Sequence, residues 1–202
     1  MIPVDRCADV VTQKLALRRQ MREKLGTLTQ AAQVAASAEA CALLRQKTRW
    51  NEARAVLFYA PLTNELNIWP LLTEARAAGK TVALPRFIAE KKLYAACEIN
   101  DPARDLQAGH FGVLEPVAHC APISISRLDF ILVPGVAFDL HGRRLGRGKG
   151  FYDLLLAVVR GTTCGVAFDE QIVREVPVEP HDIGLNCILT PTRWIEQSGA
   201  RF

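Results

Sequence analysis

The sequence predicts an α/β fold, built as a three-layer, mainly parallel sheet with helices on both faces. Strand-like apolar segments alternate with helical ones along the chain, and such alternation favours a parallel sheet that is covered on both sides. The strongest strand signal is LDFILVPGVAFD (128–139), because its continuous apolar run from Ile131 to Val133 is typical of a strand buried on both faces. Segments 55–60 and 81–85 have the spacing of a parallel pair joined by a crossover helix.

The remaining elements follow from apolar periodicity and from the positions of glycine and proline. Helices are expected at 14–25, from a cap at Thr29 to about Lys47, at 66–78 and at 152–159. Strands are expected at 55–60, 81–85, 92–99, 128–139, 163–168 and 187–190, with 92–99 antiparallel to its neighbour. Segment 101–126 contains two glycines and three prolines and is expected to be mostly loop.

Length and composition indicate a globular protein. The chain of 202 residues is expected to form a single domain over residues 1–202. Its residues are 50% hydrophobic and 23% charged, which is typical of a folded chain. No apolar run approaches the roughly 20 residues that span a bilayer, and the N-terminal segment carries charged side chains where a signal peptide would be apolar. We therefore expect a cytoplasmic protein with no membrane partner.

Charge and cysteine usage exclude several other classes. The net charge of +4 helps to attract anions but is too small to predict nucleic-acid binding. The six cysteines form no CxxC pair and the four histidines lack metal-ligand spacing, so neither a zinc site nor a redox motif is indicated. The cysteines are expected to be reduced and to pack as small buried hydrophobes. No large exposed apolar stripe is evident, so we expect a monomer.

A glycine-rich basic loop follows the strongest strand and leads into a helix. In PGVAFDLHGRRLGRGKGFYD, glycines at 146, 148 and 150 alternate with Arg147 and Lys149, and Arg144 precedes them. Such glycines allow positive φ angles, and their successive N–H groups can surround an anion. In parallel sheets ligands bind beyond the carboxyl ends of the strands, where this loop lies. The density of donors suits a di- or triphosphate.

Two known phosphate-binding patterns do not fit this loop. A Walker A motif would require Ser or Thr after Lys149, where Gly150 stands. A dinucleotide-binding GxGxxG motif would require a glycine at the position of Phe151. A solvated turn with basic side chains is the simpler interpretation, but such a turn needs neither alternating glycines nor a strand–loop–helix setting.

The stretch LVPGVAFDLHGRRLGRGKGFYD resembles the signature of the 5-formyltetrahydrofolate cyclo-ligase family. Four other segments resemble the family in the same order: KLALR (14–18), FYAPLTNELN (58–67), GVLEP (112–116) and GVAFDEQIVREVPVEPHD (165–182). The resemblance spans nearly the whole chain and implies a Rossmann-like sheet with an isomerase-like topology. The chain departs from the family's pattern at Asn186, where an aspartate is common, and at Asn67, where a carboxylate or another polar residue is common.

The reaction that this resemblance implies is the ATP- and magnesium-dependent conversion of 5-formyltetrahydrofolate to 5,10-methenyltetrahydrofolate, with release of ADP and phosphate. Ring closure must expel the formyl oxygen, and hydroxide is a poor leaving group. Phosphorylation of that oxygen makes it leave as phosphate, after which N10 can close the ring. Phosphoryl transfer depends on positioning and charge neutralisation more than on a protein nucleophile, which agrees with the absence of an obvious nucleophilic triad from the sequence.

The resemblance also assigns residues to three parts of a site. The ATP-binding residues that it implies are Lys14, Leu15, Arg18, Arg144, Leu145, Gly146, Arg147, Gly148, Lys149, Gly150, Phe151 and Tyr152. The folate-binding residues that it implies are Leu62, Glu65, Asn67, Arg147, Gly148, Lys149, Gly150 and Phe151. The implied catalytic side chains, which would offset transition-state charge, are Arg144, Arg147 and Lys149. The implied Mg²⁺ ligands are Asp153 and Asp182, which suffice when phosphate oxygens and water complete the shell.

Simpler roles remain open for several of these residues. Lys14 and Arg18 lie four apart on one helix face and could form a solvated basic surface. Asp153 could stabilise the start of its helix, Asp182 could be an ordinary loop residue, and Glu65 could be a charge at a helix start.

Two other functions also remain open at this level. One is a sugar-phosphate isomerase-like α/β enzyme whose loop binds a single phosphate. It leaves the convergence of cations unexplained, and the sequence lacks a clear Glu/His base set for it. The other is a non-catalytic regulator that binds folate or nucleotide, which agrees poorly with the intact set of Arg144, the glycine-rich loop, Asp153 and Asp182.

Overall fold

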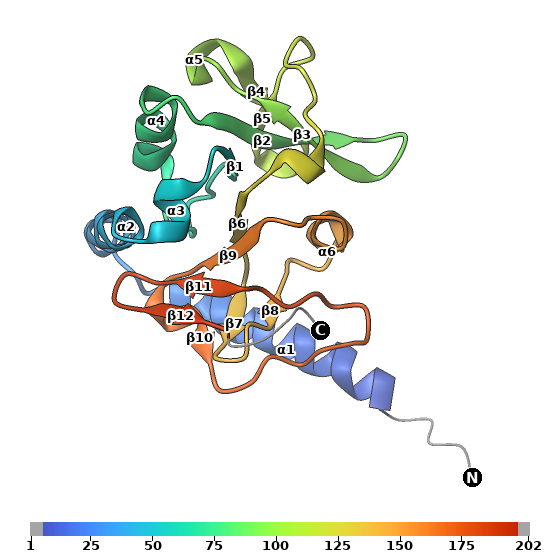
Figure 1. The fold of residues 1–202 in the computed structure, drawn as a ribbon. Helices are drawn as coiled ribbons and strands as arrows, with labels where there is room; N and C mark the ends of the chain where they lie inside the picture. Colours follow the sequence, from blue (N-terminus) through green and yellow to red (C-terminus); the bar gives the residue numbers. More distant parts are fainter. Residues whose placement is uncertain (1–5, 198–202) are drawn as a thin grey trace.

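The computed structural model describes residues 6–197, and for residues 6–8, Phe111 and Phe151 it describes the backbone alone. Over these residues the main strands are β1 (Ala55–Leu57), β2 (Thr81–Ile88), β3 (Leu93–Glu98), β6 (Phe130–Pro134), β9 (Thr162–Val166), β11 (Cys187–Leu189) and β12 (Trp194–Glu196). They form one sheet in the order β12–β11–β9–β6–β1–β2–β3 (Figure 1). The inner five strands are parallel, and the edge strands β3 and β12 are antiparallel to their neighbours.

Helices cover both faces of this sheet. Their bounds are α1 (Arg6–Leu25), α2 (Gln30–Arg45), α3 (Thr48–Glu52), α4 (Trp69–Ala77), α5 (Pro102–Asp105) and α6 (Phe151–Leu156). Helices α2, α3 and α4 pack on one face, and α6 packs on the other (Figure 1). Side chains of β6 alternate between the two cores, since Phe130 and Leu132 face α2–α4 while Ile131 and Val133 face α6. The expected three-layer, mainly parallel α/β fold is confirmed, and so is the burial of β6 on both faces.

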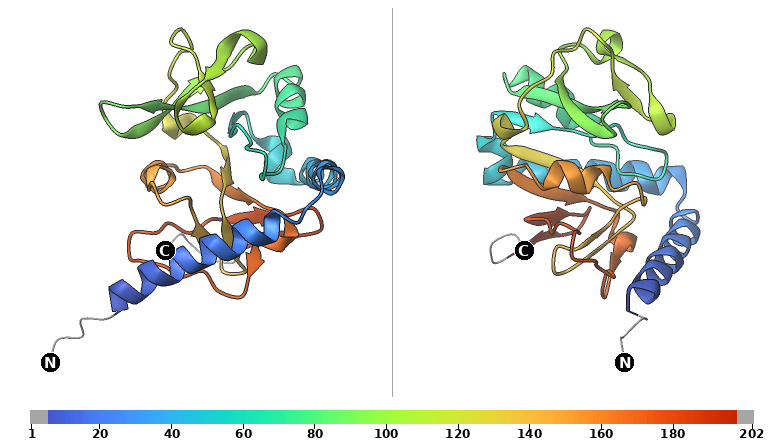
Figure 2. Two further views of the ribbon diagram at one scale, coloured as in Figure 1. Left: turned by 180° about the vertical axis from the view of Figure 1, so that it is seen from behind. Right: turned by 90° about the vertical axis from the view of Figure 1, so that its right-hand side faces the viewer.

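A small sheet joins the first helix to the rest of the protein. It contains β7 (Ala137–Asp139), β8 (Arg144–Leu145) and β10 (Ile172–Val173), in the order β10–β7–β8. On α1, Met21 is buried against Ala137, Leu145 and Val176. Figure 2 shows α1 as a long helix lying along the outer side of this region. The sheet therefore positions both α1 and the chain that leaves β8.

Helix α2, strand β2 and strand β11 lie close to the sequence-based expectations, whereas α1 begins at Arg6 instead of Lys14 and β1 ends at Leu57 instead of Ala60. Thr29 caps α2 as expected, because its hydroxyl accepts a hydrogen bond from the Ala32 N–H at 3.2 Å. Strand β3 pairs antiparallel with β2, also as expected. The five cysteines whose side chains are described are buried and unbridged, which agrees with their expected packing role, whereas the side chain of Cys7 lies outside the described part.

Four expectations about local structure were wrong. Segment 128–139 forms two strands, β6 and β7, which belong to different sheets. The chain turns between them at Gly135, where a Cβ atom would lie 2.5 Å from the Phe138 ring. Segment 101–126 is not mostly loop. It contains α5 and a hairpin formed by β4 (Leu106–Ala108) and β5 (Leu114–Pro116). It also contains two 3-10 turns, η1 (His110–Gly112) and η2 (Ile125–Arg127). Helix α4 begins at Trp69 rather than at Leu66, and α6 ends at Leu156. Helix α3, the strands β8, β10 and β12, and the 3-10 turn η3 (Asp169–Gln171) were not expected.

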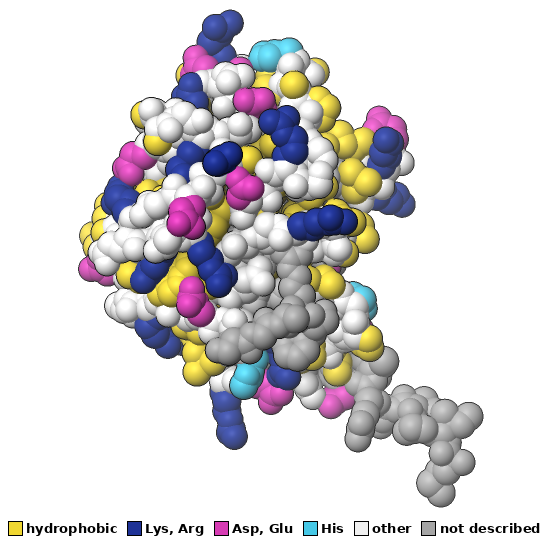
Figure 3. Space-filling model, viewed as in Figure 1, with side chains coloured by type: hydrophobic (Ala, Val, Ile, Leu, Met, Phe, Trp, Pro, Cys, Tyr) yellow, Lys and Arg dark blue, Asp and Glu magenta, His cyan; other side chains and the backbone are white. Residues whose placement is uncertain are grey.

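The surface carries both signs of charge. On the face shown in Figure 3, acidic and basic side chains are interspersed and single hydrophobic side chains lie between them, which agrees with the modest net charge of +4. Within the described residues, none of the helices has the length and apolar character needed to cross a membrane.

A buried carboxylate fixes the hairpin that carries Arg144. Asp139 is fully buried, and its Oδ1 accepts the backbone N–H groups of His141 at 2.9 Å and Arg143 at 3.1 Å. Its Oδ2 accepts the N–H of Val176 at 3.0 Å. The side chain thus closes the β7–β8 turn and ties it to the segment after β10.

We predict that Asp139→Ala lowers the free energy of unfolding by about 2–5 kcal/mol, because it leaves buried N–H groups without an acceptor. Asp139→Asn keeps one acceptor oxygen and should lose less. Glu39→Ala, at an exposed position of α2, is the control and should change stability by no more than about 0.5 kcal/mol. Urea denaturation measures all three variants, and equal stabilities for Asp139→Ala and Glu39→Ala would refute the role given to Asp139.

Candidate functional site

A cavity of about 630 Å³ opens at the carboxyl ends of the parallel strands. The chain just after β1 contributes Tyr59, Ala60 and Leu62, and the end of β6 contributes Pro134 and Gly135. Helix α1, the loop from β8 to α6, the segment near residue 180, and residues of β2, β3 and the β5 region complete the wall. The cavity therefore lies where ligands are expected in a parallel α/β sheet.

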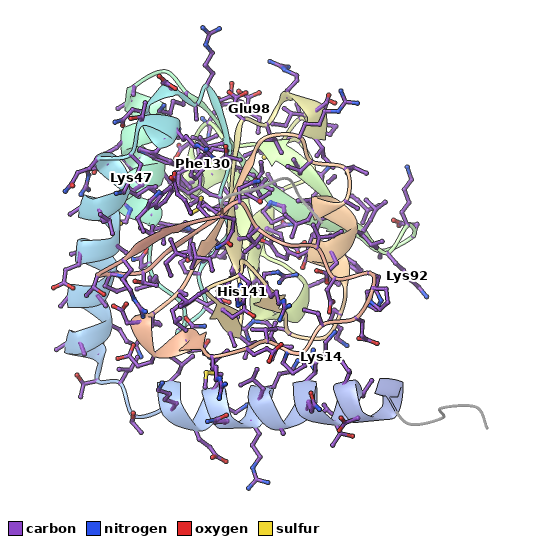
Figure 4. The ribbon with its side chains drawn as sticks, turned by 60° about the horizontal axis from the view of Figure 1, so that its bottom comes forward. Lys14, Lys47, Lys92, Glu98, Phe130 and His141 are labelled. Carbon is purple, nitrogen blue, oxygen red and sulfur yellow. The ribbon has the colours of Figure 1, made fainter. Side chains whose placement is uncertain are left out.

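Helix α1 presents one face to this cavity through Val11, Lys14, Leu15 and Arg18. Lys14 is buried, and its ammonium lies 2.7 Å from a carboxylate oxygen of Glu179 and 2.6 Å from one of Asp182. Figure 4 shows Lys14 on the side of α1 that faces the rest of the protein. The Nε of Arg18 donates a hydrogen bond to the Gly146 carbonyl at 2.9 Å. The basic face is therefore docked against the loop segments instead of being fully solvated.

The two acidic partners keep Lys14 charged. Burial by itself lowers the pKa of this lysine, but the hydrogen bonds and charges of Asp182 and Glu179 outweigh it, so the pKa of Lys14 is raised above its usual value. A raised lysine pKa stabilises the folded state fully at every pH below the pKa of lysine in the unfolded chain. This stabilisation is lost only when the pH rises through the raised pKa of the folded state. The ammonium is thus retained throughout the neutral range.

The glycine-rich loop has the backbone freedom that its sequence predicts. Gly148 and Gly150 have φ angles of +95° and +69°, a region that side chains disfavour. At Gly146 a Cβ atom would lie 2.9 Å from Nη1 of Arg144, so a side chain there would displace that guanidinium. All five residues from Gly146 to Gly150 line the cavity. The side chain of Phe151 lies outside the described part, so its expected contacts are not described.

Arg144 is a buried cation at the base of the loop. Its Nη2 donates to Asp153 at 2.7 Å, and its Nη1 donates to the Pro134 carbonyl at 3.3 Å. The guanidinium carbon lies 5.7 Å from the centre of the Tyr152 ring. Its Nε is buried and has no hydrogen-bond partner among the described residues. The hydrogen bonds of Arg144 therefore come from its two terminal nitrogens, which hold the guanidinium between Asp153 and the end of β6.

Arg147 links the loop to the chain that follows β1. Its Nη2 lies 2.8 Å from Oε1 of Glu65 and 3.3 Å from Oδ1 of Asn64. The Glu65 side chain is 7% exposed and its Oε2 also accepts the N–H of Leu62 at 3.0 Å, whereas the Arg147 side chain is 49% exposed. The Glu65 carboxylate is nearly buried, so it depends on a cation or another donor beside it.

Tyr59 and Tyr152 also line the cavity, but they do not serve as acids or bases. Burial, followed by the nearby carboxylate of Glu65, raises the pKa of both phenols well above the usual value. The Tyr59 hydroxyl donates to the Leu66 carbonyl at 2.7 Å. Both rings therefore remain neutral and offer flat apolar surface.

The expected metal ligands Asp153 and Asp182 both line the cavity, but each is bound to a cation, Arg144 and Lys14 respectively. Neither belongs to a preformed group of three ligand atoms among the described residues. They nevertheless fit Mg²⁺, since this ion commonly takes one or two carboxylates and completes its shell with phosphate oxygens and water. A separate group of Asp105, His119 and Cys120 has ligand atoms within 4.8 Å of one another; these residues do not line the cavity.

Most of the residues expected at the site meet in this cavity. Lys14, Leu15, Arg18, Leu62, Glu65, residues 144–150, Tyr152, Asp153 and Asp182 all line it. Asn67 does not, because its side chain accepts the Trp69 N–H at 3.0 Å at the start of α4. Asn186 also lies elsewhere and accepts hydrogen bonds from the backbone and hydroxyl of Thr163.

Sequence reasoning gave no role to several other residues of the wall. Glu115 and Val113 come from the GVLEP segment, and Glu179 and His181 come from the EPHD segment. Tyr94 comes from β3. The two motifs were recognisable, but only the folded chain shows which of their side chains reach the cavity.

Comparisons with known proteins decide the family. The model of the 5-formyltetrahydrofolate cyclo-ligase family matches residues 10–191. The chain belongs to this family. Among its members, the 5-formyltetrahydrofolate cyclo-ligase of Mycolicibacterium smegmatis is 36% identical over 152 residues, which cover 70% of this chain and 76% of that protein. The 5-formyltetrahydrofolate cyclo-ligase of Escherichia coli (strain K12) is 35% identical over 149 residues, which cover 70% of this chain and 80% of that protein.

A solved structure agrees with this membership of the cyclo-ligase family. The NMR structure of Aquifex aeolicus 5,10-methenyltetrahydrofolate synthetase matches with a TM-score of 0.82 and 31% sequence identity. The match covers 94% of this chain and 95% of that one. The sequence-based expectation that the chain is an enzyme of this family is confirmed.

The loop glycines allow a matched test of the cavity's role in this cyclo-ligase. Gly150 and Gly79 have similar φ angles, +69° and +77°, and a Cβ atom at either would meet nothing within 4 Å. We predict that Gly150→Ala and Gly79→Ala each lower the free energy of unfolding by about 1–2 kcal/mol, the cost of the left-handed conformation. Only Gly150→Ala should weaken the binding of inorganic triphosphate in calorimetry. Equal affinities for the two variants would contradict the anion-binding role of the loop.

Proposed function

We propose that this protein converts 5-formyltetrahydrofolate to 5,10-methenyltetrahydrofolate in a reaction that consumes ATP, requires Mg²⁺, and releases ADP and phosphate. The observation that carries the proposal is the convergence of cations and carboxylates around one cavity. Lys14, Arg18, Arg144, Arg147 and Lys149 all line the cavity, together with the glycines of the loop. This array suits a triphosphate far better than a single phosphate.

The proposed reaction needs one phosphoryl transfer and one ring closure. The γ-phosphoryl group passes from ATP to the formyl oxygen, and the bond to ADP breaks. N10 then attacks the formyl carbon and loses its proton to solvent, while the carbon–oxygen bond breaks and phosphate leaves. Neither step needs a protein nucleophile, because positioning and charge neutralisation supply the catalysis of phosphoryl transfer. Arg144, Arg147 and Lys149 are the proposed stabilisers of the transferring group.

The ion pairs of the site suggest how ATP enters. Lys14 is held by the carboxylates of Glu179 and Asp182, and Arg144 is held by that of Asp153. A phosphate can replace such a carboxylate without leaving a buried cation unpaired. Asp182 and Asp153 are then free to hold Mg²⁺, which neutralises charge on the phosphates. The backbone amides of residues 146–150 and the side chains of Leu15, Arg18, Leu145 and Tyr152 complete the proposed ATP site.

The folate side of the proposed site begins at the chain after β1. Leu62 and Glu65 line the cavity there, and Arg147 connects Glu65 to the glycine-rich loop. A reduced folate placed between these two segments would have its formyl group next to the phosphate-binding loop. Residues 147–150 would then contact both ligands, as transfer between them requires.

The direct test is to mix the protein with ATP, Mg²⁺ and 5-formyltetrahydrofolate. We predict the near-ultraviolet absorbance of methenyltetrahydrofolate and one ADP per product. Two controls accompany the assay, one without ATP and one in which a chelator removes Mg²⁺. We expect no product in either control. Turnover of sugar phosphates instead would support an isomerase, and folate binding without ATP consumption would support a regulator; either outcome would refute the proposal.

A second prediction concerns Lys149, which is exposed at the loop. Lys149→Ala should lower kcat/KM for ATP by roughly tenfold to a hundredfold, the loss expected for one charge-assisted hydrogen bond. Lys91→Ala, which removes an exposed lysine from the turn between β2 and β3, is the control and should leave the rate unchanged. Steady-state kinetics with each variant decides, and an unchanged rate for Lys149→Ala would contradict the assigned role.

A further inference from the structure

One carboxylate of the cavity differs from all the others. Five acidic side chains line the wall: Glu65, Glu115, Asp153, Glu179 and Asp182. All except Glu115 lie within salt-bridge distance of a lysine or arginine. Among the described residues the ionisable neighbour of Glu115 is His110, whose Nδ1 lies 3.8 Å away. Among the described residues, Glu115 is therefore a nearly buried acceptor with no lysine or arginine within salt-bridge distance.

The protein holds this carboxylate in place. Its Oε1 accepts the backbone N–H of His110 at 3.2 Å, and its Oε2 accepts that of Phe87 at 3.3 Å. Gly109 makes room for it, because a Cβ atom at that position would lie 2.5 Å from two carbons of the Glu115 side chain. Glu115 itself is only 5% exposed. Each oxygen uses one lone pair in these bonds and keeps another for a donor from the cavity.

The surroundings of Glu115 suit a flat, neutral group. Tyr94, Pro85 and Val113 line the cavity near it, and the Tyr94 and Tyr152 rings lie 5.9 Å apart between centroids. Burial, followed by the nearby Glu115 charge, raises the pKa of Tyr94, so its phenol stays neutral. Figure 1 shows β5 beside β2 and β3, whereas the glycine-rich loop follows β8. Glu115 and the basic loop thus belong to different walls of the cavity.

We propose that Glu115 binds the hydrogen-bond donor edge of the folate's pterin ring, formed by its 2-amino group and the adjacent ring N–H. The inference rests on the proposed function and adds a specificity-determining residue to it. A carboxylate accepts two such parallel donors, and a site with a buried acceptor rejects ligands that lack them. The glutamate tail of the folate carries carboxylates, which Glu115 would repel.

This contact also fixes the direction of the substrate. The 2-amino group and N5 lie at opposite sides of the fused rings, so a pterin anchored at Glu115 turns its N5-formyl group away from this wall. The glycine-rich loop borders the same cavity. Glu65 differs from Glu115 in this respect, because its Oε1 is already paired with the Arg147 guanidinium at 2.8 Å.

The test is Glu115→Gln, which keeps the size of the side chain but replaces one acceptor oxygen with a donor. We expect the Kd and KM for 5-formyltetrahydrofolate to rise about tenfold to a hundredfold, and the KM for ATP to change by less than about threefold. Glu98→Gln, on β3 and outside the cavity wall, is the matched control and should behave as the unaltered protein. Thermal unfolding of both variants checks that the fold is intact.

A substrate analogue separates recognition from a structural role. The 2-desamino analogue of 5-formyltetrahydrofolate lacks the proposed donor, so the unaltered protein should bind it about tenfold to a hundredfold more weakly than the natural substrate. Glu115→Gln should bind the two compounds with similar affinity. If the variant keeps the full preference for the 2-amino compound, or if its folate affinity is unchanged, the role of Glu115 is refuted.

Equilibrium binding measurements test the role of Glu115 separately from the proposed reaction. If the unaltered protein binds 5-formyltetrahydrofolate but forms no methenyl product, the proposed reaction fails, and the comparison of affinities still decides on Glu115. If product forms and Glu115→Gln binds folate normally, only the Glu115 inference fails. If the unaltered protein binds no 5-formyltetrahydrofolate, both are overturned.

Discussion

Charge balance within a partly buried cavity is the constraint on which the rest of the site depends. Lys14 and Arg144 are buried, and a buried cation requires a close anion because its lost hydration is not otherwise replaced. Glu179 and Asp182 supply these anions for Lys14, and Asp153 supplies one for Arg144. The pair of Lys14 and Asp182 joins residues that are far apart in the chain, so the same contacts that satisfy the charges also hold α1 against the loop near residue 180. Fold and site are therefore stabilised by one set of interactions.

These ion pairs also keep the site ready for an anionic ligand. The cations already line the cavity, so a polyphosphate would take the place of the carboxylates beside them. On the other wall, Glu115 has no lysine or arginine within salt-bridge distance among the described residues. The cavity thus has a side suited to phosphates and a side suited to neutral donors, which is the asymmetry that transfer from ATP to a folate requires.

Sequence alone predicted the features that depend on local chemistry. The apolar run of β6, the Thr29 cap and the positive φ angles of Gly148 and Gly150 all follow from residue type and spacing. The break at Gly135 could not be predicted, because apolar residues continue on both sides of it and the reason for the turn is the Phe138 ring packed over the glycine. The isolation of Glu115 from cations is likewise a property of the folded chain. Asn67 looked like a ligand contact, yet it serves the start of α4, a role that its position two residues before Trp69 also allows.

The most direct measurement of the central claim is a crystal structure of the protein with ADP and Mg²⁺. The account predicts the terminal phosphate within hydrogen-bonding distance of the amides of residues 146–150. It also predicts that Lys14 and Arg144 have turned from Asp182 and Asp153 to phosphate oxygens. A nucleotide bound outside the cavity, with both ion pairs intact, would contradict it.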